Sequence, residues 1–251
     1  GNAVVTFAVS ALDETDGAIT PVVTTARTAG LTSGSAFPVG TTTVTATARD
    51  VAGNVGTAQF TVTVSDTEGP AISVPANITQ STDAGLATAS VTFAPTATDN
   101  VDGALMVTTN PVSGFDFPVG TTTVTASAID TAGNSSSATF TVTVTDDEAP
   151  VVTTPANITD TAVAGQTSQV VNFTVSALDN VDGAIAATAN PPSGTAFPVG
   201  TTTVAVTATD GAMNTGSASF TVTINDGSAP VVTVPANIAV DNDAGQGNAV
   251  V

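Results

Sequence analysis

The chain has 251 residues, and 21 acidic residues against two basic ones give it a formal net charge of −19. It contains no Cys, His, Trp, Tyr or Lys. These absences exclude the usual zinc sites, thiol nucleophiles, Ser–His–Asp catalysis and lysine Schiff bases. So acidic a chain is repelled by nucleic acid and by anionic membrane surfaces. We therefore expect a structural or binding protein that is not an enzyme and has no nucleic-acid partner.

The hydropathy of the chain is unusual for so acidic a protein. Only 9% of the residues are charged while 41% are hydrophobic, which is too apolar for ordinary disorder. No apolar stretch approaches the roughly 20 residues that span a bilayer, so we expect no membrane insertion. The chain has no initiating Met and no signal peptide, and we expect a mature piece or a fragment.

Internal repeats organise the chain. Phe-Pro-Val-Gly-Thr-Thr-Thr-Val begins at Phe37, Phe117 and Phe197, each 80 residues after the last, and Pro-Ala-Asn-Ile recurs with the same spacing at Pro75, Pro155 and Pro235. Repeats of fixed period indicate tandem structural units. They predict domains at 1–65, 66–145 and 146–225, followed by 226–251, which matches the first strand or strands of a further domain.

Alternation of apolar and polar residues predicts strands in every repeat. In chain order, the complete second repeat shows it at 71–78, 91–95, 121–129 and 139–145, with turn signals such as Asp-Asn-Val-Asp-Gly between the strands. The first repeat carries six extra residues, which we place in its loop at 24–33. Short strands separated by frequent turns, without helical periodicity, are typical of a β-sandwich in each repeat.

The combined motif resembles the hyalin repeat (HYR) domain. The pattern consists of Pro-Ala-Asn-Ile, Ala-Thr-Asp-Asn-Val-Asp-Gly, Phe-Pro-Val-Gly-Thr-Thr-Thr-Val, Asp-Thr-Ala-Gly-Asn and Phe-Thr-Val-Thr-Val. It covers 66–145, 146–225 and most of 1–65. The resemblance implies an all-β, immunoglobulin-like fold in a linear array, and a secreted or cell-surface protein linked with adhesion or matrix. Many members carry cysteines, so their absence here removes any expectation of disulfides.

The first repeat begins out of phase with the others. Gly1 corresponds to Ala87, so the first domain lacks a counterpart of the strand at 71–78, whereas the tail has a spare one at 231–238. Gly-Asn-Ala-Val-Val stands both at 1–5 and at 247–251, an offset of three 80-residue periods plus the six extra residues. We expect either a window of a longer polypeptide or separate chains joined by strand addition. The residues predicted at such a joint are Val231, Val232, Val234, Ile238, Val5 and Phe7.

Acidic residues recur at the loops that share one pole of such a sandwich. Repeat two has Asp66, Glu68, Asp99, Asp102 and Asp130; repeat three has Asp146, Glu148, Asp179, Asp182 and Asp210; repeat one has Asp13, Asp16 and Asp50, with Asp226 of a preceding unit as its missing member. Oxygen ligands in this number suit Ca²⁺, which would bridge domain junctions. Asp, Asn and Gly are also ordinary turn residues, and that interpretation stays open.

Four sequons mark candidate N-glycosylation sites at Asn77, Asn134, Asn157 and Asn172. The predicted function is an extracellular stalk, fibre or filament of HYR-like domains, with further copies of the chain as end-to-end partners and possible glycan or matrix contacts. The alternative is an adhesin stalk or an adhesive module that recognises glycan or protein. Polymerisation of the segment favours the first, and monomeric behaviour with ligand binding favours the second.

Overall fold

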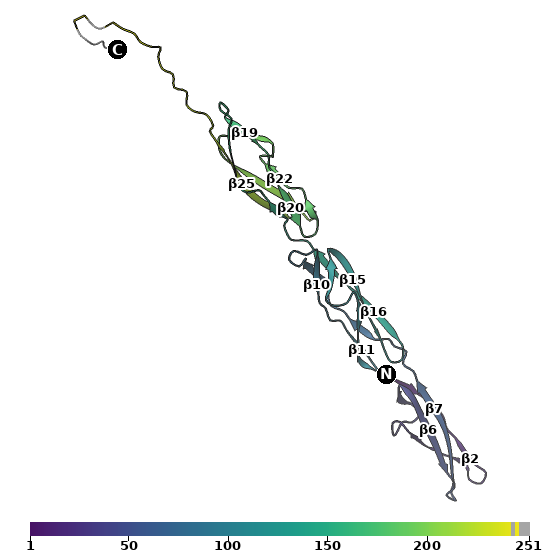
Figure 1. The fold of residues 1–251 in the computed structure, drawn as a ribbon. Coiled ribbons are helices and arrows are strands. Elements are labelled where there is room, and N and C mark those ends of the chain that lie inside the picture. Colours follow the sequence, from purple (N-terminus) through teal and green to yellow (C-terminus); the bar gives the residue numbers. More distant parts are fainter. Residues whose placement is uncertain (242–243, 246–251) are drawn as a thin grey trace. The chain divides into compact units, whose positions relative to one another are not determined.

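The computed structural model describes residues 1–241, 244 and 245, and all regular structure in that part of the chain is β-strand (Figure 1). The strands form two compact units, Gly1–Asp83 with Ala87–Thr145 and Ala84–Leu86 with Asp146–Val251. The first unit holds a first domain (β1–β7) and a second domain (β8–β16), and the other unit holds a third domain (β17–β25). No helix of the described residues has the length and apolar character that crossing a bilayer requires.

The second domain is a complete β-sandwich of nine strands. One sheet has the order β13-β15-β16-β9, a second has the order β12-β11-β8, and β10 pairs with β14. The strands are β8 (Ala71–Ser73), β9 (Ile78–Ser81), β10 (Thr88–Val91), β11 (Thr96–Asp99), β12 (Gly103–Leu105), β13 (Thr108–Asn110), β14 (Phe115–Pro118), β15 (Gly120–Ile129) and β16 (Ser135–Thr145).

The third domain repeats this arrangement strand for strand. Its sheets have the orders β22-β24-β25-β18 and β21-β20-β17, and β19 pairs with β23. The strands are β17 (Val151–Thr153), β18 (Ile158–Thr161), β19 (Ser168–Val171), β20 (Ser176–Asp179), β21 (Gly183–Ile185), β22 (Thr188–Asn190), β23 (Thr195–Pro198), β24 (Gly200–Thr209) and β25 (Thr215–Asn225).

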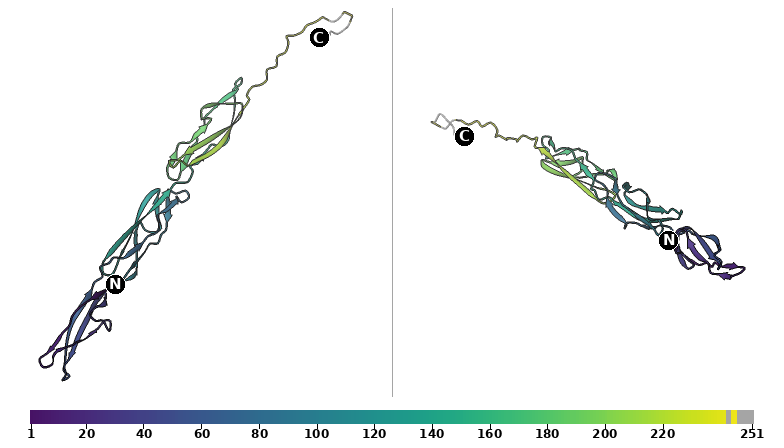
Figure 2. Two further views of the ribbon diagram at one scale, coloured as in Figure 1. Left: turned by 180° about the vertical axis from the view of Figure 1, so that it is seen from behind. Right: turned by 90° about the horizontal axis from the view of Figure 1, so that it is seen from below.

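Each domain is built around a long antiparallel hairpin, and Figure 2 shows the domains from two further sides. In the second domain it pairs β15 with β16 from Gly120↔Val144 to Ile129↔Ser135. Val124, Ala126 and Ala128 of β15 are buried, while the residues between and beside them, such as Thr123 and Ser127, are more exposed. This period of two is the one that the sequence predicts, so the all-β expectation of tandem sandwiches is confirmed.

Phenylalanines and valines fill the space between the sheets. In the second domain Phe93 lies edge-on to Phe140, with ring centroids 4.9 Å apart. The buried cluster consists of Ala89, Val91, Phe117, Val124, Phe140, Val142 and Val144. The third domain has a matching cluster around Phe197 and Phe220.

The single strand expected at 71–78 is instead two strands in different sheets. β8 pairs antiparallel with β11, and β9 pairs parallel with β16. Between them lies Pro75, whose ring removes a ladder N–H, and the chain crosses there from one sheet to the other. Val74 and Ile78 pack on the core on either side of it. The segment therefore closes both sheets of its domain.

The first domain lacks both of these strands. Its sheets are β4-β6-β7, β2-β3 and β1-β5, so β2 and β7 each have a free edge within the described residues. The six extra residues fall between β4 and β5. The strands are β1 (Asn2–Val5), β2 (Ala11–Asp13), β3 (Gly17–Ile19), β4 (Val22–Thr25), β5 (Ser35–Pro38), β6 (Gly40–Arg49) and β7 (Val55–Val64).

Candidate functional site: acidic triads and an open first domain

Two triads of aspartates come together at the N-terminal poles of the second and third domains. One consists of Asp66, Asp99 and Asp130, and the other of Asp146, Asp179 and Asp210. Within each triad, one carboxylate oxygen of every residue lies within 4.8 Å of the others. The residues come from the domain entrance, the end of the strand paired with β8 or β17, and the turn of the long hairpin. These loops were predicted to share a pole, and the sequence placed all six residues in the candidate site.

Backbone hydrogen bonds hold the carboxylates in place. Asp99 Oδ1 accepts from the N–H groups of Val101 and Asp102, at 2.7 and 3.0 Å, and these bonds lower the pKa of Asp99. Asp130 accepts from the N–H of Asn134 at 2.7 Å. The Asn134 side chain then donates to the carbonyl of Asp66 at 3.3 Å, which ties the domain entrance to the hairpin turn.

The third-domain triad is buried and short of positive charge. Asp179 is 5% exposed, and its Oδ2 is buried without a hydrogen-bond partner. Burial raises the pKa of Asp146; the N–H of Glu148 opposes this shift, and the negative charges of Asp179, Asp210 and Asp182 add to it. Buried carboxylates are stable when a cation or a donor compensates them. The buried oxygen of Asp179 therefore lacks the donor that usually compensates a buried carboxylate within the described part of the chain.

The other four predicted ligands of the second and third domains accept hydrogen bonds from nearby loops. Asp102 accepts from the N–H of Thr131, and Asp182 from that of Gly211. Glu68 accepts from the Asn100 side chain, and Glu148 from the N–H of Gly85. These four residues were predicted as metal ligands because they lie in the acidic loops at the same pole, and they are outside the two triads; their role as ligands stays a prediction.

The first domain has the counterparts of two of the three triad loops and lacks the entrance loop. Asp13 Oδ1 accepts from the N–H groups of Thr15 and Asp16, and Asp16 accepts from Val51, as in the complete domains. Asp50 is bound by the Asn54 side chain, which lowers the pKa of Asp50. No entrance aspartate from the described residues joins Asp13 and Asp50 in a triad.

Asp226, the predicted third member, lies at the end of the third domain. Its Oδ1 accepts from the N–H of Ser228 at 2.8 Å. Asp66 and Asp146 make the same bond with Glu68 and Glu148. The tail thus begins with the turn that opens a complete domain.

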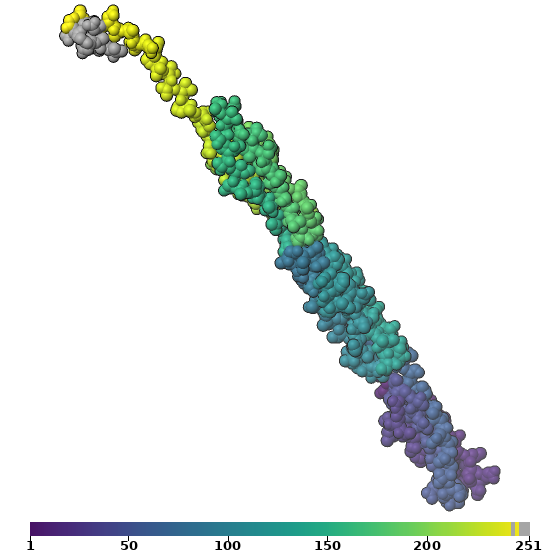
Figure 3. Space-filling model, in the orientation of Figure 1, coloured from purple at the N-terminus to yellow at the C-terminus, as the bar shows by residue number. Residues whose placement is uncertain are grey.

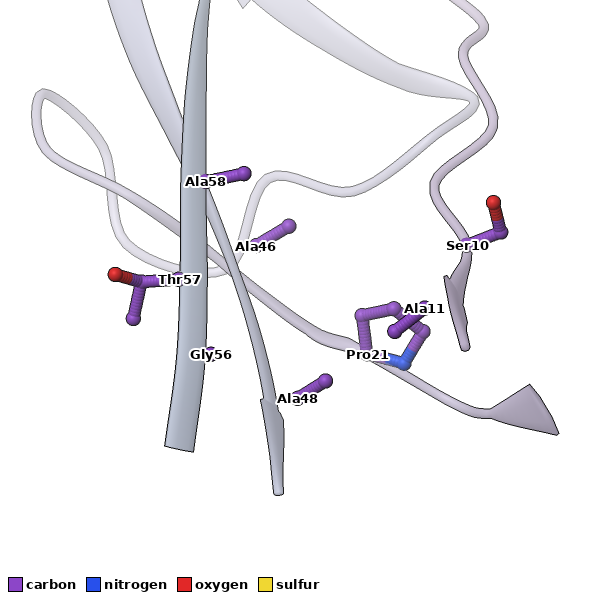
Figure 4. Close-up of a pocket in the computed structure, with 8 residues that line it drawn as sticks. All are labelled: Ser10, Ala11, Pro21, Ala46, Ala48, Gly56, Thr57 and Ala58. Atoms are coloured by element: carbon purple, nitrogen blue, oxygen red, sulfur yellow. The ribbon is translucent and has the colours of Figure 1, made fainter. Parts of the chain in front are cut away.

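An apolar pocket marks the open side of the first domain (Figure 4). Its volume is about 230 Å³, and it is lined by Ser10, Ala11, Pro21, Ala46, Ala48, Gly56, Thr57 and Ala58. In the complete domains this side is covered: Pro70 and Pro150 are buried there, and β8 and β17 pack over the long hairpins. The pocket is the place that the missing strand occupies elsewhere.

The core of the first domain is correspondingly open. Phe60 is half-buried, whereas its counterparts Phe140 and Phe220 are 3% and 4% exposed. Only Phe37, Val44 and Val62 form its fully buried cluster among the described residues. Val5 and Phe7, predicted at the joint, are half-buried and pack against this cluster.

The tail is exposed over its described length. Residues 226–241 form no strand, and Figure 3 shows them uncovered by the third domain. Val231 and Val232 are 92% and 80% exposed, and Val234 and Ile238 are exposed as well. The strand expected at 231–238 therefore has no ladder partner in the single chain. The repeated Gly-Asn-Ala-Val-Val at 247–251 lies outside the described residues.

The sequon asparagines have different surroundings. Asn77 and Asn157 accept from the N–H groups of Thr141 and Thr221, at 3.0 and 2.9 Å, and so fasten β9 and β18. Asn134 uses its side-chain nitrogen within the acidic loops. Asn172 is exposed. Glycosylation of these residues stays a prediction.

These features define a tandem array of β-sandwich domains with an acidic centre at the entrance of each complete domain. Residues 2–64, 65–144 and 145–224 each match the family model of the HYR domain. The chain belongs to the HYR domain family.

The chain is similar to two sea-urchin proteins named hyalin. It is 40% identical over 228 residues to that of Strongylocentrotus purpuratus, covering 87% of this chain and 19% of the hyalin. It is 39% identical over 213 residues to that of Lytechinus variegatus, covering 80% and 40%. The chain therefore spans less than half of either relative.

The solved structures that are similar to this chain include cadherin repeats. Protocadherin gammaB7 EC3-6 is 16% identical, with a TM-score of 0.34, covering 86% of this chain and 63% of that one. Mouse cadherin-23 EC22-24 is 14% identical, with a TM-score of 0.34, covering 90% and 93%. The similarity concerns the fold.

Proposed function

We propose that this chain is an extracellular structural repeat protein that assembles end to end, residues 226–241 of one copy completing the first domain of the next. Membership of the HYR family, whose members the resemblance links with matrix and adhesion, supports the extracellular setting. The observation that carries the proposal is the pair of free edges on β2 and β7 beside an apolar pocket. Unpaired edges and apolar surface of this kind favour the addition of strands.

The complete domains define the register of the joint. Ile72 lies opposite Ala97 in β11, and Ile78 lies opposite Val142 in β16. By the same register Val232 lies opposite Ala11, and Ile238 lies opposite Val62 of the next copy. The docked tail thus supplies one antiparallel strand to β2 and one parallel strand to β7.

The tail also has the side chains that this position needs. Val152 and Ile158 pack on the third-domain core, and Val232 and Ile238 are their counterparts. Asn237 corresponds to Asn77 and Asn157, so it is placed to accept from the N–H of Thr61 in the next copy. Burying one such apolar side chain contributes about 1.5–3 kcal/mol.

In each complete domain, a glycine lies where the segment before the buried proline comes close to the long hairpin, and the tail and the first domain have the residues for the same close approach. In the second domain a Cβ at Gly69 would lie 2.8 Å from Ser136 Oγ, so glycine precedes the buried Pro70. In the third domain the glycine is instead on the hairpin, at Gly216, and Ala149 precedes the proline. A Cβ added at Gly216 would lie 1.9 Å from the carbonyl oxygen of Pro150.

The tail and the first domain follow the third-domain pattern. In the tail, Ala229 precedes Pro230. The hairpin residue that would lie against this segment is Gly56, and a Cβ added there would have no neighbour within 4 Å among the described residues. Sequence reasoning missed Gly56, although its alignment with Ser136 and Gly216 was a signal. By the third-domain pattern, the close neighbour of Gly56 in the proposed joint would be the carbonyl oxygen of Pro230, the residue after Ala229.

We also propose that the two triads hold Ca²⁺. Asp66, Asp99 and Asp130 would bind one ion, and Asp146, Asp179 and Asp210 a second, through hard carboxylate oxygens completed by backbone carbonyls and water. The buried, unpartnered oxygen of Asp179 supports this proposal. An ion there would neutralise three like charges and hold the entrance loop to the hairpin turn.

The test of assembly compares two neighbouring valines of the tail. Val232→Asp places a charge on the inward side of the docked strand, whereas Val231→Asp places one on the outward side, where its counterpart Val151 is 70% exposed. Both valines are exposed in the single chain, so neither change should disturb its fold. We expect polymers, seen by sedimentation and electron microscopy, for the wild type and Val231→Asp but monomers for Val232→Asp. Equal behaviour of the two variants, or a monomeric wild type, would refute the proposal.

A further inference from the structure

We infer that the tail of one copy binds two domains of the next copy, since Gly245 reaches the entrance of the second domain there and donates its backbone N–H to Glu68. This inference rests on the proposed docking of residues 226–241 in the first domain. It adds a contact beyond the strands of that joint, and the partner is again a second copy of this chain.

An Ala-Gly loop recurs at one phase of the repeat. The three copies are Ala84-Gly85, Ala164-Gly165 and Ala244-Gly245, each 80 residues after the last. All three glycines have a positive φ, of 72°, 85° and 83° in chain order. Glycine adopts this conformation at little cost, whereas other residues do not. The tail therefore carries a loop residue with the backbone conformation of its two counterparts.

The first two loops bind the segment that follows their own domain. The N–H of Gly85 donates to the two carboxylate oxygens of Glu148, at 3.1 and 2.9 Å. The N–H of Gly165 donates to Ser228 Oγ at 2.8 Å. Glu148 and Ser228 are counterparts, 80 residues apart, and Glu68 is the third residue at this phase. The same backbone donor thus binds the same entrance position twice in the described chain.

Glu68 has a different donor. It accepts from the side chain of Asn100. The counterpart Asn180 donates instead to the carbonyl of Leu86 in the Ala-Gly loop, at 2.7 Å. Gly1 corresponds to Ala87, so the loop that would serve Glu68 is found at the other end of the sequence, in the tail. Glu68 and Asn100 therefore bind each other at an entrance where the third domain binds a loop.

The entrance pockets of the two complete domains differ by this loop. In the third domain the pocket has a volume of about 450 Å³, and Gly85 forms part of its wall beside Glu148 and Asn180. The corresponding pocket of the second domain has a volume of about 280 Å³ and no loop residue in its wall. It is lined by Glu68, Gly69, Ala71, Thr98, Asp99 and Asn100. The side on which Gly245 would lie is therefore open in the single chain.

The tail is long enough to place Gly245 beside Glu68. Docking fixes Ile238 opposite Val62 of the next copy, as Ile78 lies opposite Val142. From these pairs the two routes to the contact have equal lengths in the sequence. The loop route is seven residues, from Ile78 to Gly85 and from Ile238 to Gly245, and the entrance route is six residues, from Val142 to Glu148 and from Val62 to Glu68. The proposed register therefore brings the loop to the entrance without any change in chain length.

The test is a double-mutant cycle in the full chain, with dissociation constants measured by sedimentation. Glu68→Ala removes the acceptor, and Gly245→Pro removes the donor N–H. Both residues are exposed in the single chain, so neither change should disturb its fold. We expect each change to weaken assembly about tenfold, the lower end for a hydrogen bond to a charged group because Asn100 competes for Glu68. The double variant should be no weaker than either single variant.

The control is Asp116→Ala, which removes an exposed carboxylate outside the acidic loops and should leave assembly unchanged. A loss equal to that of Glu68→Ala would show a general effect of charge and overturn the inference. Full assembly of both single variants, or additive losses in the double variant, would overturn the contact and leave strand docking intact. A wild-type chain that stays monomeric would overturn the docking itself, and this inference with it.

Discussion

The proposed approach of the Ala229-Pro230 segment to Gly56 allows a test by compensating substitutions. Gly56→Ser adds a side chain where the third domain leaves a Cβ only 1.9 Å from the Pro150 carbonyl oxygen. A Cβ added at Gly56 would have no neighbour within 4 Å among the described residues, and the backbone there has no positive φ, so the monomer should fold normally. Overpacking of this kind costs about 1–3 kcal/mol, which weakens association about 5- to 150-fold.

The second domain indicates which second substitution should relieve the clash made by Gly56→Ser. There Ser136 stands on the hairpin, and Gly69 stands before the proline. Combining Gly56→Ser with Ala229→Gly copies this pair, and we expect the double variant to assemble within a few-fold of the wild type. Ala229→Gly alone should have a small effect. Dissociation constants from sedimentation, arranged as a double-mutant cycle, give the coupling energy between the two positions.

Two results would refute this reasoning. If Gly56→Ser assembles as well as the wild type, the tail does not cross the hairpin at Gly56. If the double variant is no better than Gly56→Ser, the two positions do not meet, and the docking register is wrong. Thermal unfolding of each variant as a monomer, in the Val232→Asp background, controls for damage to the first domain.

Three further predictions concern the tail and the triads. A peptide of residues 226–241, added to the monomeric Val232→Asp chain at 100 times its Kd, should stabilise the first domain by about 2.7 kcal/mol in calorimetry, and an unchanged melting profile would contradict docking. Asn237→Ala should weaken assembly about fivefold, because a lost hydrogen bond costs about 1 kcal/mol, and unchanged sedimentation would show that Thr61 is not its partner. Asp146→Asn removes one of three crowded charges and should therefore raise the Tm of the third domain in EDTA, by roughly 4–8 °C for a gain in stability of about 1 kcal/mol. A lower Tm in EDTA would show that the charge of Asp146 is compensated without an ion.

Much of the fold could be predicted from local patterns. The period of two in residues such as Val124 and Ala126 predicts a strand with one buried face, and Asp-Asn-Val-Asp-Gly predicts the turns. The 80-residue repeat and the phase of Gly1 predict that the first domain lacks an element. Each of these inferences needs only residue order, because side-chain alternation and turn chemistry are local properties.

Contacts between distant residues could not be obtained in this way. The alternation at 71–78 continues through Pro75, yet the chain changes sheets there, because Ile72 and Ile78 have partners in β11 and β16. Acidity alone could not separate Asp99, which faces the triad, from Asp102, which caps Thr131. Only coordinates show which carboxylate oxygen already has a donor.

The proposed register also determines where the acidic end of the tail would lie. Asp226 and Ile238 are at the two ends of the same tail, so docking that places Val232 in the pocket would bring Asp226 close to Asp13 and Asp50, as Asp146 precedes Val152 in the third domain. Apolar burial would favour such a joint, whereas repulsion among the carboxylates would oppose it. The proposed register therefore depends on apolar and small residues such as Ile238 and Gly56, and the acidic residues alone would not favour it.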